Sequence, residues 1–585
     1  MSGGVPSMRS RWSAAAPWIT ACALPVAFLL VAGVLLFPGA GHDDTHIAYW
    51  PAHTLADSGR ILNYNGERVE QGSSLLHILL LAFLLKVTGA DVVTLGRIAG
   101  IAAGTAMLVV LFVFVRGIAG RFAAHLAVWF SATCVYVVYW SFGGMETPFV
   151  PLVGLLLIIA LARFLRDPAS PSLLLPGLAM AACLTVRPES PILLGGMIAG
   201  LALVYWRAGG SRLPAGVDRR VMRGRLARLC ALYGTLLALL LGFRLWVFGQ
   251  WSPQPVRAKF GGLSWAALKQ GLEYLSGSAG GMGPGSWALP GALAIGCAVV
   301  LGRLLQRNPW DPGLWLALLY TGGGAAFVLG SGGDWMEGGR FLVHFIPIAG
   351  ALLAMALTGT GRKMVSSMGV AFVLIGLELW GIHHFMDHKS SSCPAWSEVR
   401  GGCNGDPAAY SWFERHSRIN QRDMPVIRAL DRWTTRIERR KREPILILSG
   451  QMGMVPYYIA ERHFGRVRFI DLRGLVERSL TDCPAARGVG RTPMGLSLDY
   501  SGYFQLLEAQ DSACRLSRPD FIFDIMSLYA GQVTALGYTM VYRQRGSVTC
   551  VDFPGAPFVD AHAFIAVRSE LLGGEDLREV VQENF

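Results

Sequence analysis

Two adjacent carboxylates, Asp43 and Asp44, have the clearest capacity for chemistry in this sequence of 585 residues. They stand in "GHDDTHIAYW" (41–50), directly after an apolar run. A carboxylate beside another resists losing both protons at once, so one pKa rises and that group can take a proton from an alcohol. A solvated or helix-capping pair at a membrane interface is an equally simple interpretation. A third is a divalent cation held by these acids and by His42, His46 and His53, although no ligand spacing supports a metal.

A second set of ionisable residues is spread over five further segments. They are "GRILNYNGERVEQG" (59–72), "SFGGMET" (141–147), "RPES" (187–190), "PQPVRAKF" (253–260) and "SGGDWMEGGRFL" (331–342). Arginine presents a planar fork that matches phosphate oxygens, and lysine adds a point charge. Together the cations of these segments predict a phosphate-binding site. Each cation alone is also consistent with anchoring at the membrane interface. Glu146 is consistent with a carboxylate at a helix start, and the acids of 59–72 are consistent with weak local ion pairs.

The composition predicts that much of the chain lies in lipid. Hydrophobic residues make up 52% and charged residues 16%, whereas soluble domains carry about 25% charged residues. The mean hydropathy is +0.42. The net charge of +13 is typical of basic cytoplasmic loops, and no basic stripe interleaved with aromatic residues indicates nucleic acid as a partner.

Eleven apolar stretches are expected to cross the membrane, since a crossing helix needs about 20 residues. They are 17–38, 98–115, 122–140, 148–163, 172–186, 191–206, 229–249, 287–304, 314–330, 340–358 and 363–382. We interpret the further apolar stretch 73–89 as a juxtamembrane helix, because only then do all the basic loops fall on the cytoplasmic side. This topology places the unusual polar segments, including a long first external loop (40–97), together outside. A cluster of ionisable groups on one face of a membrane protein suggests a site.

The segment 383–585 has no crossing stretch and is expected to form an extracytoplasmic α/β domain after the membrane domain 1–382. Five short β-rich segments alternate with helical ones, namely 444–449, 467–471, 520–525, 538–542 and 563–567. In an oxidising compartment, Cys393–Cys403 and Cys483–Cys514 are candidate disulfides. No CxxC pair indicates zinc. The G-x-x-G turn in "LSGQMGMVPYYIAERH" (448–463) is too weak to predict a nucleotide site.

The order of these motifs resembles the GT-C glycosyltransferases, and most closely the terminal arabinofuranosyltransferases of mycobacteria and their bacterial relatives. The resemblance covers about residues 15–480 and is most specific in the loop 42–89 and in "GGDWMEGGRF". It implies that Asp43 or Asp44 is the base, with Asp43 preferred, and that Arg340, Lys259 and Arg257 bind the donor phosphate. The remaining residues of the implied substrate pocket are His46, Glu70, Glu146, Arg187, Asp334, Trp335 and His344.

The resemblance implies transfer of a sugar, arabinofuranose by preference, from a polyprenyl-phosphate donor to a hydroxyl of a glycan or glycoprotein. The reaction would take place at the outer face of the cytoplasmic membrane. "EQGSSLLH" (70–77) departs from the family's pattern, which leaves the acceptor and the sugar open. No nucleotide is needed and no cofactor is certain; a divalent cation stays an option without a clear ligand motif. The alternatives are a transporter or flippase for a lipid-linked glycan, and a non-catalytic glycan-assembly protein.

Overall fold

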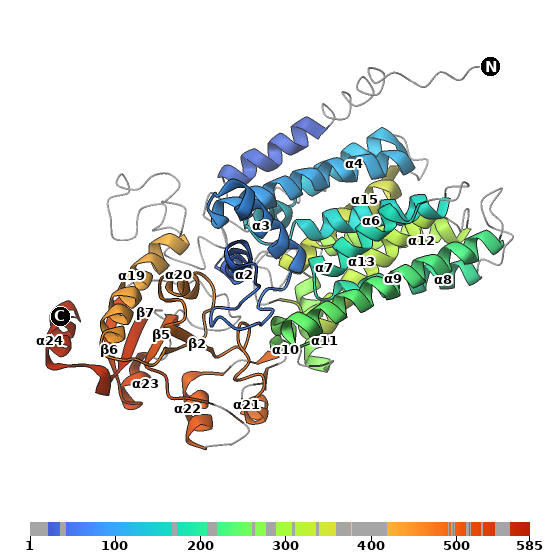
Figure 1. Ribbon diagram of the computed structural model, residues 1–585. Helices are drawn as coiled ribbons and strands as arrows, with labels where there is room; N and C mark the ends of the chain where they lie inside the picture. The colour runs from blue at the N-terminus through green and yellow to red at the C-terminus, as the bar shows by residue number, and fades with distance from the viewer. Residues whose placement is uncertain are drawn as a thin grey trace.

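The computed structural model consists of a helical bundle beside an α/β region (Figure 1). It describes residues 22–35, 43–166, 172–207, 219–259, 262, 264–276, 288–306, 311–334, 339–358, 376, 418–489, 491–492, 495–496, 498–509, 514, 516–527, 530–544 and 562–584. We call residues 22–358 the helical bundle and residues 418–584 the C-terminal region.

Among the described residues, five helices are long and apolar enough to cross a membrane. They are α4 (Val92–Thr133), α6 (Phe149–Arg166), α8 (Ser190–Arg207), α9 (Arg219–Phe248) and α13 (Pro312–Ser331). Five apolar helices are shorter, namely Cys22–Leu35, α3 (Leu75–Thr88), α7 (Leu174–Val186), Pro290–Gln306 within α12 (Ala288–Gln306), and α15 (Ile346–Thr358). Helix α4 contains a break at Gly120, whose φ of 86° is left-handed, and this break separates the expected crossing 98–115 from the first part of the expected crossing 122–140.

The predicted count of eleven crossings stays a prediction. The stretch 363–382 lies outside the described residues except for Gly376. The predicted juxtamembrane stretch 73–89 forms α3, a helix of 14 residues. This is shorter than the about 20 residues that a crossing requires.

Short helices gather the polar segments at the end of the bundle that faces the C-terminal region (Figure 1). They are α2 (Thr45–Ser58), α5 (Val135–Phe142), α10 (Gln254–Lys259), α11 (Trp265–Leu275) and α14 (Arg340–Val343). Helix α2 begins directly after the two aspartates and ends at Gly59, whose left-handed φ of 70° closes the helix.

The C-terminal region is built on a five-stranded sheet in the order β2-β1-β5-β7-β6. Its strands are β1 (Ile445–Ser449), β2 (Val467–Asp471), β5 (Phe521–Ser527), β6 (Tyr538–Gln544) and β7 (His562–Arg568). Strands β1, β2 and β5 pair in parallel, and β7 pairs antiparallel with β5 and β6. All five strands expected from the sequence are therefore present. The boundary expected at 382/383 lies outside the described residues and stays a prediction.

Helices and a small hairpin surround this sheet. They are α19 (Arg418–Glu438), α20 (Met454–His463), α21 (Pro484–Val489), β3 (Arg491–Thr492), β4 (Gly495–Leu496), α22 (Tyr500–Glu508), α23 (Ala530–Ala535), the 3-10 turn η3 (Ser569–Leu571) and α24 (Gly574–Asn584). The predicted disulfide Cys483–Cys514 is formed and joins the segment before α21 to the loop after α22. The predicted pair Cys393–Cys403 lies outside the described residues.

The two halves share one apolar core where α2 meets α20. Trp50 of α2 packs on Tyr457 of α20, with ring centroids 5.9 Å apart, and both side chains are buried. The Tyr64 hydroxyl donates to the His46 carbonyl at 3.0 Å and lies 3.2 Å from the Gly453 carbonyl. Since buried polar groups of both halves satisfy one another, the C-terminal region has a defined place on the first loop.

Candidate functional site

Six charged side chains from six different segments form what we call the charged cluster. Its members are Asp44, Glu146, Arg187, Lys259, Asp334 and Arg340. They come from the start of α2, the loop after α5, the end of α7, the end of α10, the loop after α13 and the start of α14. Segments that are up to about 300 residues apart in sequence therefore contribute to one site, and the topology argument from sequence had placed all of them on one face.

Arg187 holds two carboxylates in the buried part of the cluster. Its Nη1 lies 2.5 Å from Glu146 Oε1, and its Nε lies 2.9 Å from Glu189 Oε1. Ser73 Oγ also donates to Glu146 at 3.0 Å. Burial alone would raise the pKa of Glu146, but the Arg187 and Arg340 charges outweigh it and lower that pKa to about 2. Glu146 is therefore ionised and is poorly suited to act as a base at neutral pH.

A glycine-rich turn shapes the next pair, Asp334 and Arg340. The Nε of Arg340 lies 2.6 Å from Asp334 Oδ2, and both side chains are buried. Helix α13 ends at Gly332, and Gly333 follows with a left-handed φ of 83°. A Cβ at Gly333 would lie 2.7 Å from Tyr274, so only glycine fits there. Trp335, a predicted pocket residue, lies outside the described residues.

Lys259 is the cation of the cluster that lacks a salt bridge to any described residue, and its side chain is half-buried. Burial and the nearby Arg340 charge lower the pKa of its ammonium, whereas Asp334 and Asp44 oppose that shift. Arg187 pairs with Glu146 and Glu189, and Arg340 pairs with Asp334, whereas the charge of Asp44 acts on Lys259. An amine placed among paired charges in this way can accept an anion from outside.

The two adjacent aspartates have different surroundings. Asp43 is buried, and its Oδ1 accepts a hydrogen bond of 2.6 Å from the Met454 backbone N–H at the start of α20. A Cβ on Gly453 would come within 2.3 Å of the same carboxyl group. Asp44 is half-buried, and its charge acts on Lys259. Asp43 therefore caps the start of α20 and Asp44 lies among the charges of the cluster, and the choice of one of them as the base stays a prediction.

Three other predicted site residues make contacts that look structural. Glu70 is buried in a two-point ion pair with Arg244 of α9, at 2.9 and 3.1 Å. Arg257 points to Asp482 of the C-terminal region, at 2.7 Å. His46 is buried, and its Nδ1 lies 3.1 Å from the Asp43 carbonyl.

His344 lies beside the charged cluster, between α14 and α15. Its Nδ1 is 3.7 Å from Glu189 Oε1. Within the described part of the chain, no three side chains of the metal-ligating kinds gather in one place, and His42 of the candidate metal set falls outside that part.

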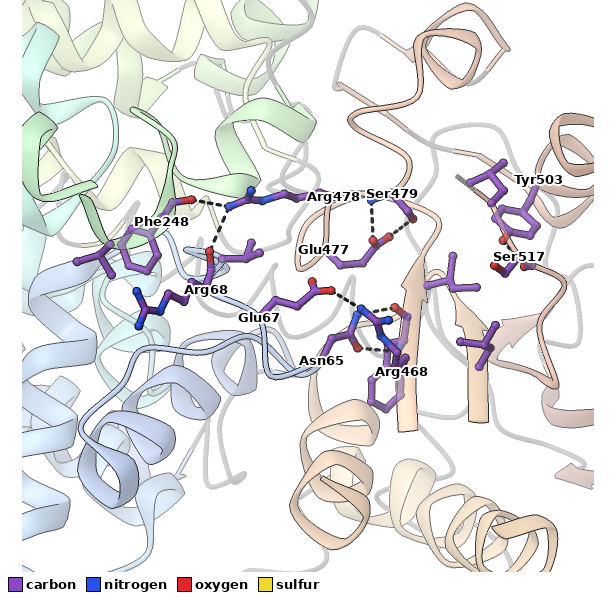
Figure 2. Close-up of a pocket in the computed structure, with 16 residues that line it drawn as sticks. Asn65, Glu67, Arg68, Phe248, Arg468, Glu477, Arg478, Ser479, Tyr503 and Ser517 are labelled. Atoms are coloured by element: carbon purple, nitrogen blue, oxygen red, sulfur yellow. Dashed lines mark hydrogen bonds and ion pairs between the residues drawn. The ribbon is translucent and has the colours of Figure 1, made fainter. Parts of the chain in front are cut away.

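A cleft of about 770 Å³ separates the first loop and the end of α9 from the C-terminal region (Figure 2). Arg478 spans it, donating to the carbonyls of Phe248 at 2.6 Å and Arg68 at 3.1 Å. Figure 2 also shows Glu67 directed toward Arg468 across the cleft. The lining mixes aromatic, hydroxyl and charged side chains.

Comparison with known proteins rests on structure. No family model matches the sequence, and no curated protein matches it. ArnT from Cupriavidus metallidurans superposes over 96% of this chain and 99% of its own chain, with a TM-score of 0.50. The sequence identity is 13% for the apo crystal structure and 14% for the crystal structure bound to undecaprenyl phosphate. The chain has the fold of the GT-C glycosyltransferases. At such identity the GT-C likeness concerns the fold alone.

Weaker similarity extends to two further GT-C proteins. The Archaeoglobus fulgidus oligosaccharyltransferase has 12% identity and a TM-score of 0.48, over 88% of this chain and 69% of its own. EmbB, an arabinosyltransferase from Mycobacterium smegmatis, has 16% identity and a TM-score of 0.37, over 61% and 31%. The resemblance to the GT-C superfamily that was predicted from the sequence is confirmed at the level of the fold by the ArnT superposition, and the arabinofuranosyl part of it stays a prediction.

Several residues that build this site were not among those predicted from the sequence. Glu189 was visible in "RPES" but was not selected, although an acid two residues after an arginine is a local signal. Arg244 lies within an apolar helix, where an ionisable residue is costly and marks a partner. Gln254 lies in "PQPVRAKF" and Gly453 in the G-x-x-G turn, but their roles could not be predicted, because these roles depend on segments more than 200 residues away.

Proposed function

We propose that this protein is a glycosyltransferase that moves a sugar from a polyprenyl-phosphate donor to an acceptor hydroxyl. The main support is the gathering of three cations, Arg187, Lys259 and Arg340, around the acids of the charged cluster at one end of the bundle, with Lys259 forming no salt bridge to a described residue. A transfer from a lipid phosphate requires a base that takes the proton of the acceptor hydroxyl. It also requires a cation that offsets the negative charge developing on the phosphate. The GT-C fold supports this chemistry.

In the proposed reaction, Asp44 takes the proton of the acceptor hydroxyl as its oxygen bonds to the anomeric carbon of the sugar. The bond from that carbon to the phosphate oxygen breaks, and its electron pair stays on the phosphate. The products are the glycosylated acceptor and a polyprenyl phosphate with one more negative charge than the donor diester. Lys259 and Arg340 offset that charge as it develops, which lowers the barrier.

The cleft beside Arg478 is our candidate for the acceptor site. The loop 59–73 borders both places, since Asn65 and Glu67 line the cleft and Ser73 binds Glu146 of the charged cluster. Aromatic and hydrogen-bonding side chains together suit a polyhydroxylated acceptor such as a glycan. Glycans and glycoproteins both present such hydroxyls.

We further propose that the site faces the outside of the cytoplasmic membrane. The positive-inside pattern of the basic loops supports this orientation. The disulfide Cys483–Cys514 supports it independently, because structural disulfides persist in oxidising compartments. Arabinofuranose is the proposed sugar, on the strength of the sequence motifs in the first loop.

The proposal is tested with purified protein in detergent and a panel of polyprenyl-phosphate sugars that includes arabinofuranose. Mass spectrometry would follow the release of polyprenyl phosphate and the mass added to candidate glycans. We expect release that depends on the acceptor and on Lys259. Movement of lipid-linked sugar across vesicle membranes without release would favour a flippase, and binding without either outcome would favour an assembly protein.

A further inference from the structure

The six-residue helix α10 connects the charged cluster to the C-terminal region. Its last residue, Lys259, belongs to the charged cluster. Its first residue, Gln254, is fully buried against the C-terminal region. In Figure 1 the helix lies where the bundle meets that region. A contact that fixes the position of Gln254 therefore also affects the position of Lys259.

Gln254 is held by three acceptors of one turn, residues 473–482. Its Nε2 lies 2.8 Å from the carbonyls of Gly474 and Glu477 and from Thr481 Oγ1. One helical turn later, Arg257 pairs with Asp482 at the end of the same turn. The Gln254 backbone N–H donates to the Glu70 carbonyl at 3.0 Å. The start of α10 is thus fastened to the C-terminal region and to the first loop together.

The turn that holds Gln254 is itself rigidly built. The Asp471 carboxylate accepts backbone N–H groups of three of its residues, Arg473, Leu475 and Val476. The Glu477 carboxylate accepts both the N–H and the hydroxyl of Ser479, each at 2.7 Å. The disulfide Cys483–Cys514 follows directly after the turn. Such a turn can serve as a fixed reference for a neighbouring helix.

A helix of this length transmits the position of its first residue to its last. Five steps of about 1.5 Å separate Gln254 from Lys259 along the axis, and the helical hydrogen bond leaves little freedom between them. Lys259 has no salt bridge to a described residue that could hold it independently. A displacement of about 1 Å at a reacting centre can cost about 100-fold in rate.

We propose that Gln254 is a positioning residue through which the C-terminal region places Lys259 on the phosphate of the lipid donor. The donor site is then complete only when the turn 473–482 is docked. This inference rests on the proposed function, because it assigns the phosphate to Lys259. It makes the C-terminal region part of the donor site as well as a wall of the acceptor cleft.

The test uses the full-length protein and four variants. Gln254→Leu keeps the size of the side chain but removes the donor to the turn, Lys259→Ala removes the charge, and the double variant combines them. Gln505→Leu makes the same chemical change at an exposed position on α22 and serves as the control. Melting temperature and formation of Cys483–Cys514 would establish that each variant folds.

Steady-state kinetics would separate positioning from general damage. We expect Gln254→Leu to raise the KM for the lipid donor or lower kcat by about tenfold or more, while the acceptor KM and the Gln505→Leu control stay at wild-type values. In the Lys259→Ala background, Gln254→Leu should add no further loss, since the two residues act as one unit. Additive losses, or a change confined to the acceptor KM, would overturn the inference.

A second readout needs no transferase activity. An amine reagent that attacks only the neutral form of lysine, followed by mass spectrometry, gives the pH midpoint for labelling Lys259. Because the pKa of Lys259 is lowered in its present position, release of α10 should move this midpoint upward in Gln254→Leu and leave it unchanged in Gln505→Leu. An unchanged midpoint in Gln254→Leu would refute the positioning role. If the midpoint shifts but the wild-type protein transfers no sugar, the proposed function is refuted, while the positioning of Lys259 through Gln254 is retained.

Discussion

The carboxylate of Asp43 caps the helix that begins at Met454, 411 residues later in the chain, through a hydrogen bond of 2.6 Å. This contact gives Asp43 a structural role. Its neighbour Asp44 lies in the charged cluster instead. It also means that the first loop cannot move away from the C-terminal region without exposing the start of α20.

The cap makes a prediction that separates structure from catalysis at Asp43. Asparagine accepts a helix-capping hydrogen bond about as well as aspartate, whereas alanine costs about 1 kcal/mol. We therefore expect Asp43→Asn to retain most of its transfer rate and stability, and Asp43→Ala to melt at a lower temperature. Transfer rate and melting temperature of the two variants provide the measurement. Loss of transfer in Asp43→Asn with an unchanged melting temperature would return the base to Asp43.

Gly453 should be intolerant of any side chain. A Cβ there would lie 2.3 Å from the carboxyl group of Asp43, a distance that forces the turn or the acid to move. We expect Gly453→Ala to open the contact between the halves, and limited proteolysis to cleave near α20 faster than in the wild type. Gly450, where a Cβ would meet nothing within 4 Å, provides the matched control variant Gly450→Ala. Equal cleavage of both variants would contradict the close packing.

Glu70 is predicted to stabilise the protein and to take no part in the reaction. It is buried in a two-point pair with Arg244, and removing one partner of a buried pair costs about 3–5 kcal/mol. Glu70→Gln should therefore lower the melting temperature markedly, while the properly folded fraction transfers sugar at a near-normal rate. A stable Glu70→Gln protein with lost activity would instead place Glu70 at the substrate.

Glu477 should make stability depend on pH. Burial raises its pKa to about 7, above the usual value of about 4.3 for glutamate, so between these values the folded protein binds a proton that the unfolded chain has lost. Stability from this residue is then highest below about pH 4.3 and falls by up to about 4 kcal/mol as pH rises through 7. Melting curves from pH 4 to 8 should slope less in Glu477→Gln than in the wild type. Parallel curves would contradict the assignment.

Local patterns in the sequence predicted much of this structure, whereas contacts between residues far apart in the sequence could not be predicted. The five strands of the C-terminal sheet followed from β-branched runs between turns, and the charged cluster followed from counting basic loops. The partners of Asp43, Glu70 and Gln254 could not be predicted, because they lie 411, 174 and more than 200 residues away. Charge type alone also could not separate Arg257, which joins the halves, from Lys259, which lacks a salt bridge to a described residue.

The most direct measurement of the central claim is the single-turnover release of polyprenyl phosphate by Asp44→Asn. If Asp44 is the general base, we expect a fall of about 100-fold or more relative to the wild type, the usual contribution of a positioned general base, with melting temperature and donor binding unchanged. Release by Asp44→Asn at the wild-type rate would exclude Asp44 as the base.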